Sequence, residues 1–145
     1  MNASETTDHM VQRQDYQAPD YWIDRVNLVF ELGAECSKIR CCIEGRRREG
    51  VSADRPLWLD GDGQPLLFAS LDGAELTPDR IQLEKNGLSV FGVGEHFRLL
   101  TETEVHPSAN TALSGLYQSG AMLCTQCEAE DFRKITYFPD RPFVF

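Results

Sequence analysis

In two stretches near the start of the chain, every second position is apolar. The apolar members are Val26, Leu28, Phe30 and Leu32 in the first stretch, and Ile39, Cys41 and Ile43 in the second. A period of two is typical of a strand that buries one face. Gly33 interrupts the pattern, so we expect two antiparallel strands that meet near it. Cys41 and the adjacent Cys42 should then point to opposite faces and should not bind one ion together.

Short apolar runs continue at close intervals along the chain. They cover residues 57–59, 66–68, 81–83, 88–91 and 97–100. Turn sequences rich in Asp, Asn and Gly separate these runs. Among them, Asn86-Gly87 predicts a tight hairpin of type I′, because both central residues of that turn need a positive φ.

Many short strands without a long segment of helical period predict an all-β fold, either a curved antiparallel sheet or a β-sandwich. The only helical candidate is residues 128–135, where acidic residues come first and basic residues last, as the helix dipole favours. We therefore expect a short helical turn near the C-terminus. Residues 1–19 lack apolar periodicity and predict a flexible arm, followed by a single β domain over residues 20–145.

The charge balance of the 145 residues argues against one class of partner. The net charge is −9, and such a surface repels phosphate backbones, so we expect no nucleic-acid binding. No apolar run approaches the roughly 20 residues of a membrane span, and the first residues are polar and acidic. The five cysteines are an odd number, which argues against a disulfide framework. These features predict a cytoplasmic protein with reduced thiols and no membrane partner.

Potential metal ligands are scattered in the sequence. The histidines are His9, His96 and His106, and no His-Glu-x-x-His motif occurs. Cys124-x-x-Cys127 has no second pair to complete a zinc knuckle, and no βαβ pattern accompanies it as a redox pair usually requires. We therefore expect no metal or cofactor bound to this chain and no catalytic residue in it, and a redox role for the two cysteines is the weaker alternative.

Gln126 and Glu128 admit two interpretations. Glu128 and Glu130 are ordinary solvated acids if they only begin a helical turn, and the residues by themselves favour this interpretation. Alternatively, Gln126 and Glu128 point the same way from an extended segment and bind a cation. An α-ammonium, which is mostly charged at neutral pH, is bound well by a carboxylate together with a neutral acceptor.

Four segments of the sequence are characteristic of a known family. They are residues 15–21, 110–120, 123–130 and 132–142, and they read DYQAPDY, NTALSGLYQSG, LCTQCEAE and FRKITYFPDRP. These segments resemble bacterial aminopeptidase N, a zinc metallopeptidase of the gluzincin type. The similarity is loose over residues 21–105 and close from about residue 110 to residue 142.

The resemblance implies a fold and a function. It implies an N-terminal β domain, a curved saddle of antiparallel strands that rests on a thermolysin-like catalytic domain. It also implies that Gln126 and Glu128 bind the free N-terminal amine of a peptide substrate, so that the enzyme removes one amino acid at a time. The resemblance further implies that zinc is the cofactor of the full-length enzyme and that the missing catalytic domain is the partner of this region.

The sequence departs from the family pattern in three ways. The family's zinc-binding and exopeptidase motifs are absent, and Asp131 stands where the family usually has Gly, which we expect to alter the turn after Glu130. The last residues, 143–145, also differ from the family's continuation. We therefore expect a truncated fragment that is inactive alone. The alternative is a non-catalytic β-rich binding or interaction module.

Overall fold

The structure is a computed structural model that describes residue 14 and residues 16–141. The described part is all-β, as predicted, with antiparallel strands, three short 3-10 helices and no α-helix. The strands are β1 (Tyr21–Glu31), β2 (Ser37–Arg47), β3 (Leu57–Asp60), β4 (Leu66–Leu71), β5 (Ala74–Glu75), β6 (Ile81–Glu84), β7 (Gly87–Val90), β8 (His96–Val105), β9 (Gly115–Ser119) and β10 (Met122–Gln126). The 3-10 helices are η2 (Pro78–Arg80), η3 (Pro107–Ala109) and η4 (Phe132–Lys134).

The predicted arm, residues 1–19, lies mostly outside the described residues. In the part of the chain that the structure describes, no helix has the length and apolar character needed to cross a membrane.

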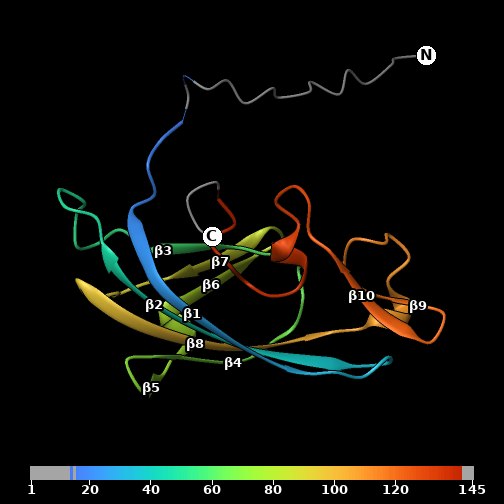
Figure 1. The fold of residues 1–145 in the computed structure, drawn as a ribbon. Coiled ribbons are helices and arrows are strands. Elements are labelled where there is room, and N and C mark those ends of the chain that lie inside the picture. Colours follow the sequence, from blue (N-terminus) through green and yellow to red (C-terminus); the bar gives the residue numbers. More distant parts are fainter. Residues whose placement is uncertain (1–13, 15, 142–145) are drawn as a thin grey trace, which may run out of the picture.

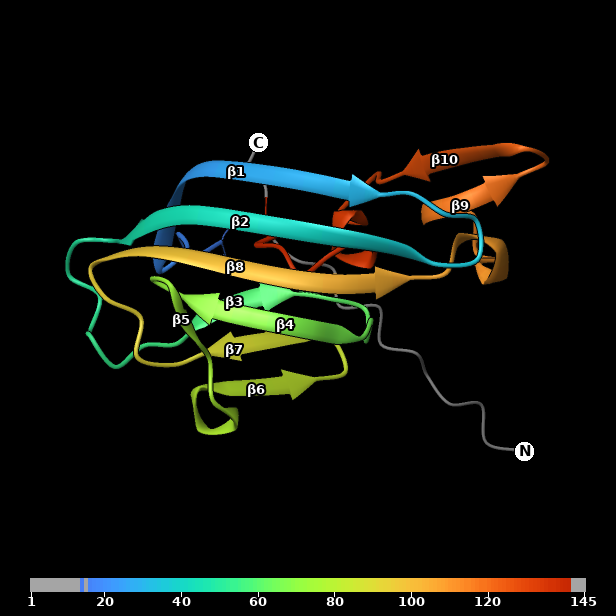
Figure 2. The same cartoon turned by 90° about the horizontal axis from the view of Figure 1, so that it is seen from below.

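The largest sheet has five strands in the order β1-β2-β8-β4-β5 (Figure 2). β1 and β2 pair antiparallel, which confirms the first prediction from the alternation. The alternation is clearest in β2, where Ile39, Cys41 and Ile43 are all buried. Cys41 belongs to the main core, whereas the Cys42 sulfur accepts a hydrogen bond from Arg98 Nε at 3.2 Å. The two thiols therefore have different surroundings, as strand geometry requires.

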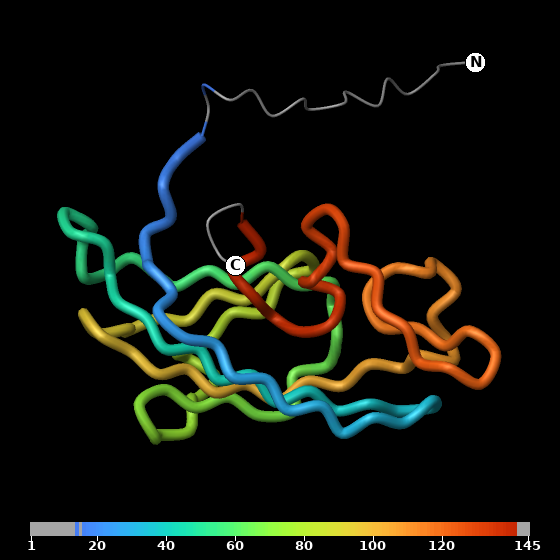
Figure 3. The backbone as a smooth tube through the Cα atoms, in the orientation of Figure 1, coloured from blue at the N-terminus to red at the C-terminus, as the bar shows by residue number. Residues whose placement is uncertain are grey.

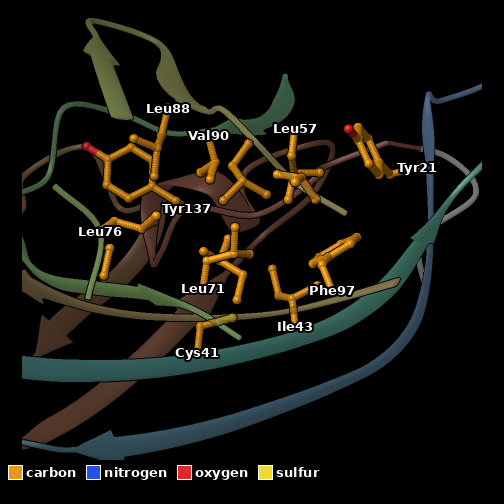
Figure 4. Packing of buried hydrophobic residues seen from close by; sticks show 14 of the residues in the cluster. Tyr21, Cys41, Ile43, Leu57, Leu71, Leu76, Leu88, Val90, Phe97 and Tyr137 are labelled. Atoms are coloured by element: carbon orange, nitrogen blue, oxygen red, sulfur yellow. The ribbon is translucent and has the colours of Figure 1, made fainter. Parts of the chain in front are cut away.

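A three-stranded sheet, ordered β3-β7-β6, covers the five-stranded sheet and makes a two-layer arrangement (Figure 1). The main core fills the space between the layers, and it includes Ile43 and Leu71 from one sheet and Leu88 and Val90 from the other (Figure 4). Tyr137, from the segment after η4, enters the same core. Burial of this apolar surface is the main force that holds the two sheets together.

The predicted hairpin at Asn86-Gly87 forms, but its turn differs from type I′. Glu84 pairs with Gly87, so the two loop residues are Lys85 and Asn86, and Gly87 is the first residue of β7. Neither Asn86 nor Gly87 has a positive φ. Both positive φ angles of such a turn occur instead at Asp72-Gly73, with 51° and 86°, between β4 and β5. The glycine at position 87 allows close packing, because an added Cβ would overlap the Trp58 ring and would lie 2.5 Å from the Leu59 carbonyl oxygen.

The third sheet is the β9–β10 pair, which lies at one end of the molecule beyond the two main layers (Figure 1). A second, smaller core of Ile39, Leu116 and Ile135 joins it to the five-stranded sheet. The helical candidate at residues 128–135 is reduced to a turn followed by η4. Glu130 has a φ of 64°, outside the right-handed helical region, so a regular helix cannot run through this position.

Candidate functional site

The candidate segment begins in the β9–β10 hairpin. Met122 pairs with Ser119, so the loop is Gly120-Ala121, and the φ of 59° at Gly120 suits glycine. Figure 3 shows the hairpin and the chain that returns from it toward the body of the molecule. Gln126 is the last residue of β10 and pairs with Gly115. The strand therefore presents Gln126 at its end, next to the turn that follows.

The turn after β10 carries the acidic residues. The Asp131 amide donates a hydrogen bond to the Cys127 carbonyl oxygen at 3.2 Å, which closes the turn. Glu130 holds the left-handed φ, a conformation that is rare and strained for a residue with a side chain. Asp131 itself has a φ of −99°, which any residue adopts without strain. The exchange of the family's Gly for Asp131 therefore puts no left-handed strain into the backbone.

The carboxylates of this turn differ in their partners. Gln126, Glu128 and Glu130 are all exposed. The Glu130 carboxylate lies 3.2 Å from Arg133 Nη2 and forms an ion pair with it. Within residues 16–141, the side chains of Gln126 and Glu128 form no hydrogen bond and no ion pair. Among the described residues, Glu128 is thus the acid of the turn that has no positively charged partner.

Arg133 anchors the turn to the rest of the domain. Its Nε lies 3.1 Å from Asp140 Oδ2, and its Nη1 lies 3.7 Å from Asp60 Oδ1. Burial lowers the pKa of Arg133, but Asp140, Asp60 and Glu130 raise it more, so the net shift is upward. Asp60 also joins residue 138 through two backbone hydrogen bonds, of 2.9 and 3.0 Å. The turn is therefore tied to β3 as well as to its own continuation.

A second set of contacts fixes the other side of the turn. Asp131 accepts a hydrogen bond from Ser114 Oγ and forms an ion pair with Lys134 Nζ at 3.4 Å. Lys134 Nζ also donates to Ser114 Oγ at 3.0 Å. The hydrogen bond from Ser114 lowers the pKa of Asp131; burial opposes the shift and Lys134 adds to it. Asp131 therefore links η4 to the segment that directly precedes β9.

The two cysteines of the segment have packing roles. Cys127 packs against the smaller core, and Cys124 pairs with Tyr117 across the hairpin. Burial raises the pKa of Cys127, and the carboxylates of Asp131 and Asp140 raise it further. A redox thiol needs a lowered pKa, because the thiolate is the reactive species. These surroundings argue against the redox alternative.

Gln126 and Glu128 lie in one short segment of the sequence, whereas the residues that hold this segment in the fold are not evident from it. In the sequence, Asp60 belongs to one of the turn segments rich in Asp and Gly, and Arg133 is one of the basic residues at the end of the helical candidate. Asp60 and Asp140 are 80 residues apart and meet through tertiary pairing, so no local pattern signals the contact of Asp60 with Arg133. Strand alternation also ends at Gln126, so a common direction for Gln126 and Glu128 stays a prediction.

No family model matches the sequence. Aminopeptidase N of Escherichia coli (strain K12) is 43% identical over 132 residues, which cover 91% of this chain and 15% of that protein. Aminopeptidase N of Caulobacter vibrioides is 39% identical over 138 residues, which cover 95% of this chain and 16% of that protein. The chain is homologous to the N-terminal region of bacterial aminopeptidase N.

This assignment concerns one region of a much larger protein. The chain spans only about 15% of the length of the aminopeptidase N relatives that it matches. It corresponds to the N-terminal domain of the zinc metallopeptidase family called M1, and it does not include the catalytic domain.

Solved structures support the fold. Aminopeptidase A of Legionella pneumophila, in complex with aspartic acid, has a TM-score of 0.79 at 24% identity over 89% of this chain and 15% of that chain. Native yeast LTA4 hydrolase has a TM-score of 0.69 at 16% identity over 86% of this chain and 21% of that chain. An M1 zinc metallopeptidase from Deinococcus radiodurans has a TM-score of 0.65 at 17% identity over 85% of this chain and 30% of that chain. At these identities the comparison establishes the fold alone.

The zinc of the aminopeptidase N family does not fit the residues of this chain. A gluzincin site needs two histidines on one helical turn, with the spacing His-Glu-x-x-His. The sequence lacks that motif, and the described residues form no α-helix to carry it.

Proposed function

We propose that this region is the substrate-amine-recognising N-terminal domain of a zinc-dependent aminopeptidase that removes N-terminal amino acids from peptides. In this proposal Gln126 and Glu128 bind the free α-ammonium of the substrate. The remaining domains of the enzyme are its partners, and they supply the zinc and the hydrolytic chemistry.

One observation carries the proposal: the segment that is closely similar to aminopeptidase N contains an exposed carboxylate without a partner among the described residues. That carboxylate is Glu128, whereas the neighbouring Glu130 is paired with Arg133. An ammonium group offers three donors and a positive charge, so it is matched by a carboxylate and an amide oxygen. The Gln126 side chain supplies such an oxygen two residues away.

The proposed role is to position the substrate. An ammonium held at a fixed distance from the catalytic centre places the first peptide bond for attack and excludes peptides that lack a free N-terminus. The contacts of Arg133 and Asp131 hold the turn that carries Glu128, so the charge is presented from an ordered segment. The 145-residue chain by itself is expected to release no amino acid from peptides, because it has no His-Glu-x-x-His helix.

The test uses the intact enzyme that carries this region together with its catalytic domain. In it, Glu128→Gln removes the charge with little change in shape. A hydrogen bond to a charged group contributes about 1.5–3 kcal/mol, so we expect KM for aminoacyl substrates to rise at least about tenfold. Since the ammonium is bound in both the ground state and the transition state, kcat should change much less.

Glu130→Gln is the matched control, because it makes the same chemical change two residues away in the same turn. It should leave KM nearly unchanged. A pair of competitive inhibitors, one with a free amine and one without, separates recognition from misfolding: Glu128→Gln should weaken only the first. Equal losses for both inhibitors, or an unchanged KM, would show that Glu128 does not bind the amine.

A further inference from the structure

Three potential metal ligands meet at the end of the five-stranded sheet. Cys36 immediately precedes β2, Glu104 lies near the end of β8, and His106 follows β8 directly. The pairing of Ser37 with Val105 brings these chain ends together. One sulfur, one carboxylate oxygen and one imidazole nitrogen from the three side chains all lie within 4.8 Å of one another. Among the described residues, no other group of three such side chains is this close.

The orientation of the imidazole is fixed from outside the cluster. His106 Nδ1 lies 2.7 Å from the Glu35 carbonyl oxygen. A carbonyl oxygen only accepts hydrogen bonds, so Nδ1 carries the proton and the lone pair of the neutral ring is on Nε2. This is the second contact that metal-binding histidines commonly make, because it fixes the tautomer and the direction of the ring.

Nε2 faces an acceptor. It lies 3.1 Å from Glu104 Oε1. Two lone pairs at this separation repel each other unless a positive charge is shared between them, either as a proton on the ring or as a bound cation. With bond lengths of about 2.0 Å, nitrogen and oxygen ligands of a tetrahedral ion are separated by about 3.3 Å, close to the distance observed.

The set of donors indicates which cation would bind. Thiolate and imidazole together favour zinc and similar ions, whereas calcium and magnesium require oxygen ligands. Cys36 and His106 are exposed and Glu104 is half-buried, so a fourth position is open to water. Lys38 pairs with Glu104 across the sheet, and its positive charge repels a bound cation. The Glu104 carboxylate and a metal-bound Cys36 thiolate supply two negative charges that outweigh it.

We propose that Cys36, Glu104 and His106 form a binding site for a zinc-like divalent cation. The site is separate from Gln126 and Glu128 and does not depend on the function proposed for them. It contradicts the expectation from sequence that the chain binds no metal. That expectation follows from the spacing of the ligands in the sequence, which does not show that His106 lies beside Cys36 and Glu104 in the fold.

Cobalt(II) is the probe that tests the proposal, with the untagged 145-residue chain kept reduced by a phosphine. A thiolate bound to cobalt gives a charge-transfer band in the near ultraviolet, and tetrahedral cobalt gives strong visible bands. We expect both, and we expect zinc to displace them. Cys36→Ser should abolish the charge-transfer band, and His106→Asn should weaken cobalt binding by about tenfold or more.

Cys124→Ser is the matched control and should keep the cobalt spectrum, and circular dichroism checks that each variant is folded. Zinc should also slow the alkylation of Cys36 in the unmodified chain, a measurement that needs no variant. A spectrum without the charge-transfer band overturns the proposal. So does a band that survives Cys36→Ser and disappears in Cys124→Ser, since the Cys124-x-x-Cys127 pair would then be the ligand.

Discussion

Arg133 Nε lies 3.1 Å from the carboxylate of Asp140, and this ion pair closes the segment that follows the turn of Glu128. Arg133 also faces Asp60, whose side chain is only 10% exposed, and Asp140, whose side chain is 14% exposed. The three residues join η4, the end of the described chain and β3. Their arrangement makes the conformation of the candidate site depend on the stability of the whole domain.

Arg133→Leu should destabilise the domain. It removes the guanidinium from two largely buried carboxylates, which keep their hydrogen bonds from backbone amides and, for Asp60, from Trp58 Nε1. A buried carboxylate that loses its charged partner costs about 1–3 kcal/mol. We expect a loss of this size in the free energy of unfolding, measured by urea denaturation. Arg40→Leu is the control, because the Arg40–Glu102 pair at 3.1 Å is exposed and should contribute less than about 1 kcal/mol. Equal effects of the two substitutions would contradict the anchoring role.

Gly87→Ala should also destabilise the domain, through packing and not through φ. The new Cβ would collide with the Trp58 ring, which a hydrogen bond of 3.0 Å from Nε1 to Asp60 holds in place. Overpacking of this kind costs about 1–3 kcal/mol. In the control, Gly94→Ala, the nearest atom is the His96 carbonyl oxygen at 3.2 Å, and the change in unfolding free energy should be smaller. A neutral Gly87→Ala would contradict the close approach of β3 and β7.

Asp131 should make the stability of the domain depend on pH. Its pKa is lowered in the folded state, chiefly by the hydrogen bond from Ser114 and also by Lys134. A lowered carboxyl pKa adds stability above the unfolded-state value of about 3.9, and this stability disappears as the pH falls through the folded-state value. Asp131→Asn should therefore unfold at lower urea than the parent at neutral pH, and the difference should vanish in acid.

The control for this experiment is Glu75→Gln. Glu75 lies exposed in the short strand β5, and within the described residues it forms no ion pair. Its substitution should change the urea midpoint little at either pH. A difference between Asp131→Asn and the parent that persists unchanged in acid would show that the ionised carboxylate is not the source of the stabilisation.

Cys127 should react slowly with alkylating reagents at neutral pH. Burial, Asp131 and Asp140 all raise its pKa, so the fraction of thiolate is small. We expect the pH midpoint of its alkylation rate, followed by peptide mass spectrometry, to lie above the ordinary cysteine value of about 8.5. The urea-unfolded chain is the reference and should show the ordinary value. A midpoint below it in the folded chain would favour the redox alternative.

The sequence determined the fold class, the pairing of the first two long strands and the position of the candidate segment. These features follow from local patterns: alternation of period two in β2, and turn residues between short apolar runs. The similarity to aminopeptidase N also came from local motifs, and it is confirmed by the relatives. The sequence by itself therefore determined the features that depend on residues close together in the chain.

Only the tertiary structure decided which side chains meet across the sheets. The glycine at position 87 is explained by the Trp58 ring on another strand, and not by the turn that its sequence indicated. Arg133 reaches Asp60 because β3 pairs with the chain at residue 138. Cys36 approaches His106 because β2 pairs with β8. Contacts between residues this far apart in the chain depend on strand register and packing, which no short sequence pattern specifies.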